Sequence, residues 1–373
     1  MLIQRRHFLI GGAAAGLIPG LAGAQTQPAR TAFDFADGKI RVPVRIKGVD
    51  VSTVLDSGGQ YHAMDTKLAR DLGVKASGKL SLSGIGGSAT AKYSDPVDIS
   101  VAGQSLAQTQ FAVLDLSRLS QGVGQPVELL LGAPLFHRFL ADIDFQSRTL
   151  ALMESAKYET PDEGAMLPLT AQRLVKTAEV LWPKDSVQAM VDTGSDACLV
   201  LSPAAAERLG VLRQGPVSTA LIAGLGGSAL GKVTSAPMLT LAGQDFADVP
   251  ITIAPREFGY EALIGCGLLS HCRAALDYPG GWLIMSARRD LPFRRDLTGL
   301  QASAQPTALR ITHVARGGPA EKAGFRVGEK ISAINGQPAV AANARLTDAV
   351  AGTKITFTLQ GGKTRELTLA RYY

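Results

Sequence analysis

The feature that most constrains this chain of 373 residues is an internal duplication. Each copy contains an apolar pair followed by Asp, a hydroxyl residue and Gly, then a glycine-rich segment, then an apolar pair followed by Gly. The matched segments are Val54–Gly58 with Met190–Gly194, Leu68–Val74 with Ala205–Val211, Gly84–Ala89 with Gly224–Ala229, Leu130–Gly132 with Leu263–Gly265, and Asp144–Phe145 with Asp277–Tyr278. Their common order and nearly constant spacing do not follow from composition, and the period is longer than that of solenoid repeats. We therefore expect two domain-sized lobes, residues 25–157 and 158–290.

The duplicated set resembles the aspartic proteases, specifically the bacterial retropepsin-like type with two lobes fused in one chain. The resemblance covers about Lys39 to Ala287. It implies a mainly β fold in which two tandem retropepsin-like β-barrel lobes form a pepsin-like bilobal unit. It also implies that Asp56 and Asp192 form a catalytic pair. The supporting turn residues would be Ser57, Gly58, Thr193 and Gly194, and the flaps over the substrate would be Gly84, Ile85, Gly86 and Gly87 in lobe 1 and Gly224, Leu225, Gly226 and Gly227 in lobe 2.

Two facing carboxylates can hydrolyse a peptide bond without a metal or a covalent intermediate, provided that they share one proton. Because close like charges do not both ionise easily, we expect the pKa of one carboxyl to rise and that of the other to fall. The ionised member takes a proton from water while the protonated member donates to the carbonyl oxygen. The resemblance therefore implies an aspartic-type endopeptidase that acts on a peptide or protein substrate and needs no cofactor or metal.

One residue departs from the family pattern. The position after Asp-Thr/Ser-Gly usually holds Ala or Ser, and Ser195 conforms whereas Gly59 does not. A glycine there loosens the first turn or changes a contact. Two alternatives stay open: a non-catalytic, protease-like peptide-binding protein, and a homodimer in which only lobe 2 is catalytic. We favour a monomer, because fused lobes need no second chain.

Within the lobes the pattern is β-rich. Residues Ile40–Ile46 alternate between apolar and polar, and Gly48 predicts a hairpin into a strand over Val49–Leu55. Further strands are expected over Thr90–Ile99, Phe111–Leu114 and Leu150–Leu152, and short helices over Thr66–Leu72 and Pro203–Leu209.

The N-terminus has the features of an export signal over residues 1–24. Arg5-Arg6 precede a short apolar run, and Ala22–Ala24 form a small-x-small cleavage site. The paired arginines before Phe-Leu resemble a twin-arginine signal, with Gln4 departing from that pattern, so ordinary secretion stays open. We expect a periplasmic or secreted protein with no membrane span after the signal is removed.

The C-terminal residues resemble a PDZ domain of the type found in bacterial periplasmic proteases. The matching segments are Leu309–Val314, Gly317–Phe325, Val327–Gly336 and Ile355–Leu359. We place the domain at residues 308–373, preceded over 291–307 by a linker or the start of the domain, with 301–307 expected to be a loop. The carboxylate-binding loop would lie near Thr298–Leu300, where the match is poor. Strand addition of a peptide ligand is therefore expected in preference to capture of a terminal carboxylate.

Other classes of function lack their signals. The net charge of +6 is not concentrated in a basic run beyond Arg288-Arg289 and Arg294-Arg295, so we expect no nucleic-acid partner. The segment Gly84–Ala89 formally fits a dinucleotide fingerprint, but the residues after it are extended in character. No His-Glu-x-x-His or Gly-x-Ser-x-Gly motif occurs. The three cysteines, Cys198, Cys266 and Cys272, are expected to be buried apolar residues, with one disulfide as the alternative.

Overall fold

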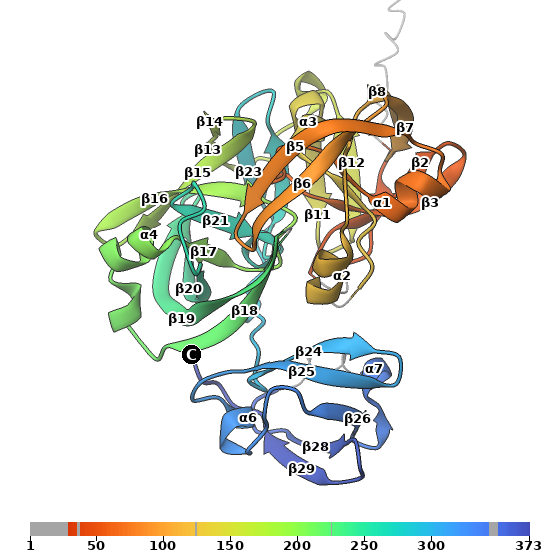
Figure 1. Ribbon diagram of the computed structural model, residues 1–373. Helices are drawn as coiled ribbons and strands as arrows, with labels where there is room; N and C mark the ends of the chain where they lie inside the picture. Colours follow the sequence, from red (N-terminus) through yellow and green to blue (C-terminus); the bar gives the residue numbers. More distant parts are fainter. Residues whose placement is uncertain (1–28, 36–37, 124, 225, 343–349) are drawn as a thin grey trace, which may run out of the picture.

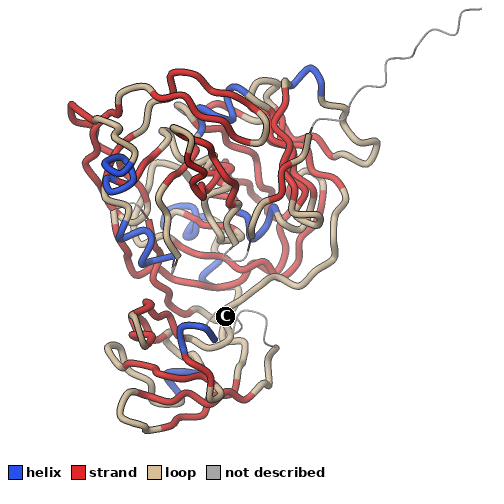
Figure 2. The backbone as a smooth tube through the Cα atoms, turned by 90° about the vertical axis from the view of Figure 1, so that its right-hand side faces the viewer, coloured by secondary structure: helices blue, strands red, loops and turns tan. Residues whose placement is uncertain are grey.

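The computed structural model describes residues 29–35, 38–123, 125–224, 226–342 and 350–373. The expected export signal lies outside these residues. Figure 1 shows two β-rich lobes side by side with a smaller domain below them, and the view in Figure 2 shows how little of the chain is helical. The fold is mainly β, as expected from the sequence.

Lobe 1 contains a nine-stranded sheet in the order β5-β6-β9-β4-β10-β3-β2-β7-β8. The β2–β3 hairpin turns at Lys47 and Gly48, whose φ angles of 49° and 80° suit a tight two-residue turn. The elements are β2 (Arg41–Ile46), β3 (Val49–Leu55), β4 (Ala63–Asp65), α1 (Thr66–Asp71), β5 (Ala76–Gly84), β6 (Gly87–Ser94), β7 (Val97–Val101), β8 (Gln104–Thr109), β9 (Ala112–Leu114), α2 (Ser117–Val123), β10 (Leu129–Leu131) and α3 (Ala133–Arg138).

Lobe 2 contains an eight-stranded sheet in the order β14-β15-β16-β21-β17-β20-β19-β18. Its elements are β14 (Thr170–Gln172), β15 (Val175–Trp182), β16 (Asp185–Asp192), β17 (Leu199–Leu201), α4 (Pro203–Arg208), η2 (Val211–Arg213), β18 (Ser218–Gly224), β19 (Gly227–Leu241), β20 (Gln244–Ile253), β21 (Ala262–Gly265) and α5 (Cys266–Leu269).

The duplication seen in the sequence recurs in the strand pairing. In lobe 1, β10 lies between β3, which is parallel to it, and β4, which is antiparallel. In lobe 2, β21 has the same two kinds of neighbour, β16 and β17. The pairs β4–β9 and β17–β20 are both parallel, and β5–β6 and β18–β19 are both hairpins. The two copies therefore fold into equivalent lobes.

A six-stranded sheet joins the lobes, in the order β1-β12-β11-β22-β23-β13. Its strands are β1 (Thr31–Ala32), β11 (Leu140–Asp144), β12 (Thr149–Met153), β13 (Ala165–Pro168), β22 (Arg273–Asp277) and β23 (Trp282–Ser286), and η1 (Ser155–Lys157) follows β12. The join is the antiparallel pairing of β11 with β22, in which Ile143 faces Ala274. One continuous cluster of buried apolar side chains spans both lobes, so the lobes share a core.

The C-terminal domain has its own sheet, in the order β24-β25-β26-β28-β29 with β27 beside β26, and its own core around Phe325 and Phe357. Its elements are β24 (Leu300–Gln305), β25 (Ala308–Val314), α6 (Pro319–Lys322), β26 (Lys330–Ile334), β27 (Gln337–Pro338), α7 (Ala339–Ala342), β28 (Lys354–Leu359) and β29 (Thr364–Thr368). The expected loop at 301–307 is wrong: β24 occupies most of it and forms a hairpin with β25. Polar composition misled the sequence prediction, because β24 is a half-buried edge strand.

Most other local predictions are confirmed. The strand expected over Thr90–Ile99 is wrong, because the chain breaks at Asp95-Pro96 into β6 and β7; Pro96 has no N–H to continue a ladder. All three cysteines are buried and none of them forms a disulfide bond, so the disulfide alternative is wrong. Burial raises the pKa of Cys198 to about 12 and that of Cys272 to about 11, which keeps both thiols protonated.

Candidate active site

The two motif aspartates lie at the ends of equivalent strands. Asp56 directly follows β3, and Asp192 is the last residue of β16. The N–H of Asp56 donates to the carbonyl of Leu131 at 2.9 Å, and Asp192 lies opposite Gly265 on β21. The two apolar-apolar-Gly strands therefore brace the two turns in the same way.

The carboxyl groups of Asp56 and Asp192 lie close together across the junction of the lobes. Gly58 and Gly194 permit this approach. A Cβ atom at Gly58 would lie 2.5 Å from Cγ of Asp192, and one at Gly194 would lie 2.6 Å from Oδ1 of Asp56. Any side chain at either glycine would occupy the space of the opposite carboxylate.

The two hydroxyl residues tie the turns together with four buried hydrogen bonds. Thr193 Oγ1 accepts from the N–H of Ser57 at 3.0 Å and donates to the carbonyl of Leu55 at 2.9 Å. Ser57 Oγ accepts from the N–H of Thr193 at 3.0 Å and donates to the carbonyl of Val191 at 2.8 Å. The arrangement is symmetric and fully buried, so it fixes each aspartate relative to the other.

Burial raises the pKa of both aspartates above the ordinary value of 3.8. For Asp192 the negative charge of Asp56 adds to burial, and its pKa rises well above that value. For Asp56 the rise is opposed by the hydrogen bond from Asp192, by the N–H groups of Gly59 and Gly58, and by the charge of Lys39. The expectation that one pKa would fall is wrong, because burial outweighs these effects. The pKa values of the two carboxyls nevertheless rise to different extents. The rise in pKa is the larger for Asp192, because the charge of Asp56 adds to burial there.

Gly59 contacts the carboxylate that it follows. Its N–H donates to Oδ1 of Asp56 at 2.9 Å. A Cβ atom at this position would lie 2.8 Å from Oδ2 of Asp56. The expected loosening of the first turn is therefore not what the geometry shows, since the glycine lets the turn close tightly on the carboxylate.

A lysine of lobe 1 lies beside the pair. Lys39 is 7% exposed, lines the same cleft as the two aspartates, and its Nζ forms an ion pair with Oδ1 of Asp196, 3.1 Å away in lobe 2. The positive charge opposes the rise in pKa of both Asp56 and Asp192. No sequence motif marks this residue, because Lys39 and Asp196 are far apart in the chain and lie outside the shared motifs.

The tips of the two flap hairpins touch each other. Gly86 and Gly226 are so close to the opposite hairpin that a Cβ atom would lie 2.2 Å from the carbonyl oxygen of Gly227 or 2.3 Å from the carbonyl carbon of Gly87, respectively. Arg256 of lobe 2 also donates to the carbonyl of Ile85 at 3.4 Å. Gly84 and Gly224 end the strands that carry these tips, and Leu225 lies outside the described residues. The described parts of the two flaps therefore meet in a closed arrangement.

Three further residues support the turns, although no sequence motif predicted this role for them. The hydroxyl of Tyr278 donates to the carbonyl of Ser57 at 3.2 Å, and Cys266 Sγ donates to the carbonyl of Thr193 at 3.3 Å. His62 Nδ1 accepts from the N–H of Gly132 at 3.0 Å, and burial lowers the pKa of this histidine to about 4, so it is neutral. Tyr278 belongs to the duplicated Asp-Phe/Tyr pair, which was the one available signal.

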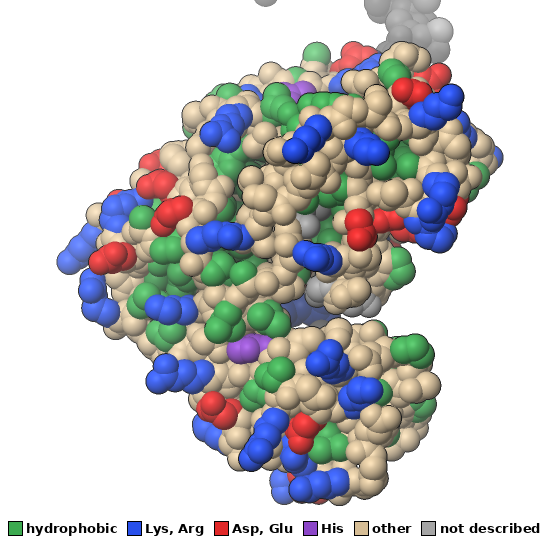
Figure 3. All heavy atoms as spheres, viewed as in Figure 1, with side chains coloured by type: hydrophobic (Ala, Val, Ile, Leu, Met, Phe, Trp, Pro, Cys, Tyr) green, Lys and Arg blue, Asp and Glu red, His purple; other side chains and the backbone are tan. Residues whose placement is uncertain are grey.

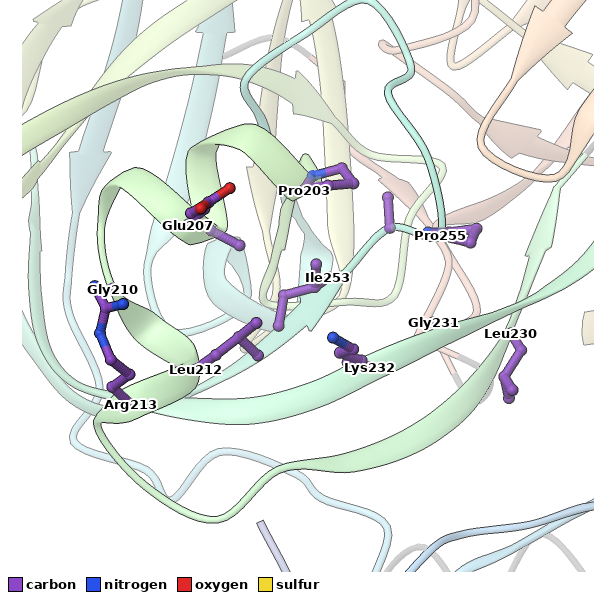
Figure 4. Close-up of a pocket in the computed structure, with 12 residues that line it drawn as sticks. Pro203, Glu207, Gly210, Leu212, Arg213, Leu230, Gly231, Lys232, Ile253 and Pro255 are labelled. Carbon is purple, nitrogen blue, oxygen red and sulfur yellow. The ribbon is translucent and has the colours of Figure 1, made fainter.

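The cleft that contains Asp56 and Asp192 has a volume of about 730 Å³. It is lined by both lobes, by both flap strands β5 and β18, and by Gln301 and Tyr373 of the C-terminal domain. A second hollow, of about 510 Å³, lies between α4 and β19 (Figure 4). The only carboxylate that lines it is Glu207, so it offers no acid–base pair.

Within the part of the chain that the structure describes, no group of three or more His, Cys, Asp or Glu side chains is placed to hold a metal ion. No described helix has the length and apolarity needed to cross a membrane. On the face seen in Figure 3, lysine and arginine side chains are spread over both lobes and the C-terminal domain and do not form one patch.

Comparisons with known proteins agree with the geometry. Residues 42–135 and 179–268 match the family described as aspartyl protease, and residues 310–360 match the PDZ domain. No curated protein sequence matches the chain. Among solved structures, the crystal structure of Basic 7S globulin from soybean is similar, with 12% identity and a TM-score of 0.46 over 69% of this chain and 94% of that one. One segment in each lobe therefore matches the retropepsin-like aspartyl protease family, and a PDZ domain follows them in the C-terminal part of the chain.

Proposed function

We propose that the protein is an exported aspartic endopeptidase whose catalytic pair is Asp56 and Asp192. The observation that carries this proposal is the close approach of the two carboxyls, each packed against the glycine of the opposite turn, in a cleft that both lobes and both flap strands line. The turn residues Ser57, Gly58, Thr193 and Gly194 position the pair, and the flap residues bind the substrate backbone. One chain supplies both aspartates, which supports a monomeric site over a site shared between two copies.

The different environments of the two carboxyls assign their roles. Asp56, ionised, takes a proton from a water molecule whose oxygen attacks the scissile carbonyl carbon. Asp192, protonated, donates its proton to the carbonyl oxygen, which gives a neutral tetrahedral diol. Collapse of the diol returns one proton to the pair, delivers another to the leaving nitrogen and breaks the C–N bond. The closed flaps exclude bulk water during these steps.

The decisive test replaces each aspartate in turn. Asp56→Asn and Asp192→Asn should each lower kcat by roughly a thousandfold or more, because either change removes the shared proton. Cleavage of a diverse peptide pool is followed across a pH series, with the exposed Asp50→Asn as the matched control. Activity that survives Asp56→Asn would support the alternative in which only lobe 2 is catalytic. Peptide binding without cleavage by the unmodified protein would support the non-catalytic alternative.

Export is proposed from the N-terminal sequence. Arg5 and Arg6 precede an apolar run and a small-x-small site, which is the pattern of a cleaved signal. N-terminal sequencing of the protein recovered from the periplasm or medium should begin near residue 25. Replacing both arginines with lysine should retain the protein in the cytoplasm if the signal is of the twin-arginine type.

We further propose that the PDZ domain binds peptide by strand addition. In the loop before β24, the carboxylate of Asp296 accepts hydrogen bonds from the N–H groups of Thr298 and Gly299, at 2.8 Å and 3.1 Å. An internal carboxylate therefore already occupies these donors. This supports strand addition over capture of a ligand's terminal carboxylate, and peptides with free and amidated C-termini should bind equally well.

A further inference from the structure

The PDZ domain is attached to the flap of lobe 2. Gln301 of β24 makes two hydrogen bonds to one residue of the flap strand β18: Leu221 N–H donates to Oε1 at 2.6 Å, and Nε2 donates to the carbonyl of Leu221 at 2.9 Å. Beside this contact, the ring of His313 lies 3.1 Å from the carbonyl of Thr219. The N–H of Arg316 donates to Thr219 Oγ1 at 3.2 Å. In Figure 1 the β24–β25 hairpin lies directly below β18.

The side-chain amide of Gln301 binds the same backbone N–H and C=O groups that an added β-strand would pair with. Among the residues that the structure describes, β18 is the last strand of its sheet and β19 is its one strand partner, so no strand pairs with its other edge. In an antiparallel ladder, alternate residues direct N–H and C=O toward the same edge. The N–H and C=O of Leu221 point to this edge, where they bind Gln301. Because every second residue points the same way, the next residue toward the flap tip with backbone groups on this edge is Ala223. Both Leu221 and Ala223 line the catalytic cleft.

The equivalent edge in lobe 1 differs. By the duplicated register, Ser81 of β5 corresponds to Leu221 and Ser83 to Ala223. Ser81 and Ser83 line the cleft, and within the described residues the backbone groups of Ser81 have no hydrogen bond to the PDZ domain. The two flaps are therefore equivalent in topology but differ in how much open strand edge they present to a substrate.

We propose that Gln301 is a specificity-determining residue of the peptidase site, which limits how far an extended peptide can pair with the flap of lobe 2. This rests on the proposed function, in which the cleft binds extended peptides. A substrate strand pairs with β18 at Ala223 and stops there, because the next pairing position, Leu221, is taken by the amide. On β5 the strand continues past Ser83 to Ser81. The protein therefore recognises more residues on one side of the scissile bond than on the other.

The test measures binding of uncleavable peptides, so that it does not depend on catalysis. Peptides whose scissile amide is replaced by a reduced CH2–NH linkage are lengthened one residue at a time at either end, and Kd is measured by calorimetry. For the unmodified protein, added residues should stop improving the affinity at a shorter peptide length at one end of the peptide than at the other. In Gln301→Ala, one further residue at that end should improve affinity by about tenfold, since it gains up to two hydrogen bonds to Leu221.

Two variants separate this role from a structural one. Gln305→Ala removes the same side-chain type from the same strand, at a position whose side chain has no hydrogen bond to β18 within the described part of the chain, and should keep the length dependence of the unmodified protein. Gln301→Met keeps the volume and lacks the amide, so it should behave as Gln301→Ala does. Identical length dependence in all four proteins would overturn the proposal.

Hydrogen exchange gives a second readout that needs no substrate. The amide of Leu221 should exchange faster in Gln301→Ala and Gln301→Met than in the unmodified protein or Gln305→Ala, while amides on the β19-facing side of β18 stay unchanged. Unaltered exchange at Leu221 would also overturn the proposal. Absence of peptide cleavage, with these binding and exchange results intact, would reject the endopeptidase alone and leave the assignment of Gln301 in place.

Discussion

At the scale of single residues, Gly59 shows how the absence of one Cβ atom lets the turn close on the carboxylate of Asp56. The family position usually holds Ala or Ser, yet a Cβ atom here would lie 2.8 Å from Oδ2 of Asp56. Gly59→Ala should therefore turn the carboxylate away from Asp192 and lower kcat by roughly 10- to 100-fold, the effect of a small misplacement of a reacting group. Gly215→Ala is the matched control, because a Cβ atom at Gly215 would meet nothing within 4 Å. Equal activity of the Gly59 variant and the control would contradict this account.

Lys39 should set the pH range of activity. Burial raises the pKa of both carboxyls of the proposed catalytic pair, and the charge of Lys39 opposes that rise in each. Activity is lost as falling pH protonates Asp56 and as rising pH deprotonates Asp192. The apparent pKa values of the acidic and basic limbs of the pH–activity profile should therefore both lie above the ordinary Asp pKa of 3.8. Lys39→Met should move both limbs to still higher pH.

The measurement is the pH profile of kcat/KM for the unmodified protein, Lys39→Met and the exposed control Lys157→Met. The control should leave the profile in place. A pH profile of kcat/KM that is unchanged or shifted to lower pH in Lys39→Met would refute the role assigned to this lysine.

At the scale of elements, one buried carboxylate fastens the sheet that joins the lobes. Asp142 of β11 is 1% exposed and binds Arg30 at 2.6 Å and Arg273 of β22 at 2.8 Å. Asp142→Ala would remove the carboxylate that Arg30 and Arg273 share, and because both guanidinium groups are partly exposed it should lower the free energy of unfolding by about 1.5–3 kcal/mol. Asp50→Ala, which breaks an exposed pair with Arg45, should cost less than about 1 kcal/mol. Denaturant titration of both variants measures the difference, and similar costs would rule out a special role for Asp142.

The elements show what local sequence could and could not predict. The strands that carry Asp56 and Asp192 were predictable, because alternating apolar residues and glycine turns act over a few residues. The break at Pro96 was also visible in the sequence, although it was not predicted. β24 was not predictable from composition: its polar residues form a strand because β25 pairs with them and because Gln301 binds Leu221. Those contacts depend on tertiary structure.

At the scale of the whole molecule, the sequence predicted the two lobes and the PDZ domain but not how they meet. The duplicated motifs imply that Asp56 and Asp192 face each other, and the hydrogen-bonding geometry agrees. The contact between the flap tips and the attachment of the PDZ domain to β18 depend on surfaces that no motif marks. Lys39 and Gln301, which both line the cleft, were missed for that reason.

The placement of the PDZ domain depends on a second contact with lobe 2, at Asp248. Its carboxylate binds Arg371, with one contact at 2.7 Å, and Arg295 at 2.9 Å, so one acidic group holds two segments that flank the PDZ sheet. Asp248→Ala should release both and loosen the domain, because two arginines would lose their shared partner. We expect a larger radius of gyration by small-angle scattering and faster hydrogen exchange at Leu221, with cleavage of the shortest peptides unchanged because the catalytic pair is untouched. Asp245→Ala, on the same strand β20, is the control. If the variant at Asp248 stays as compact as this control, then the contacts of Gln301, His313 and Arg316 with β18 suffice to fix the domain on the flap.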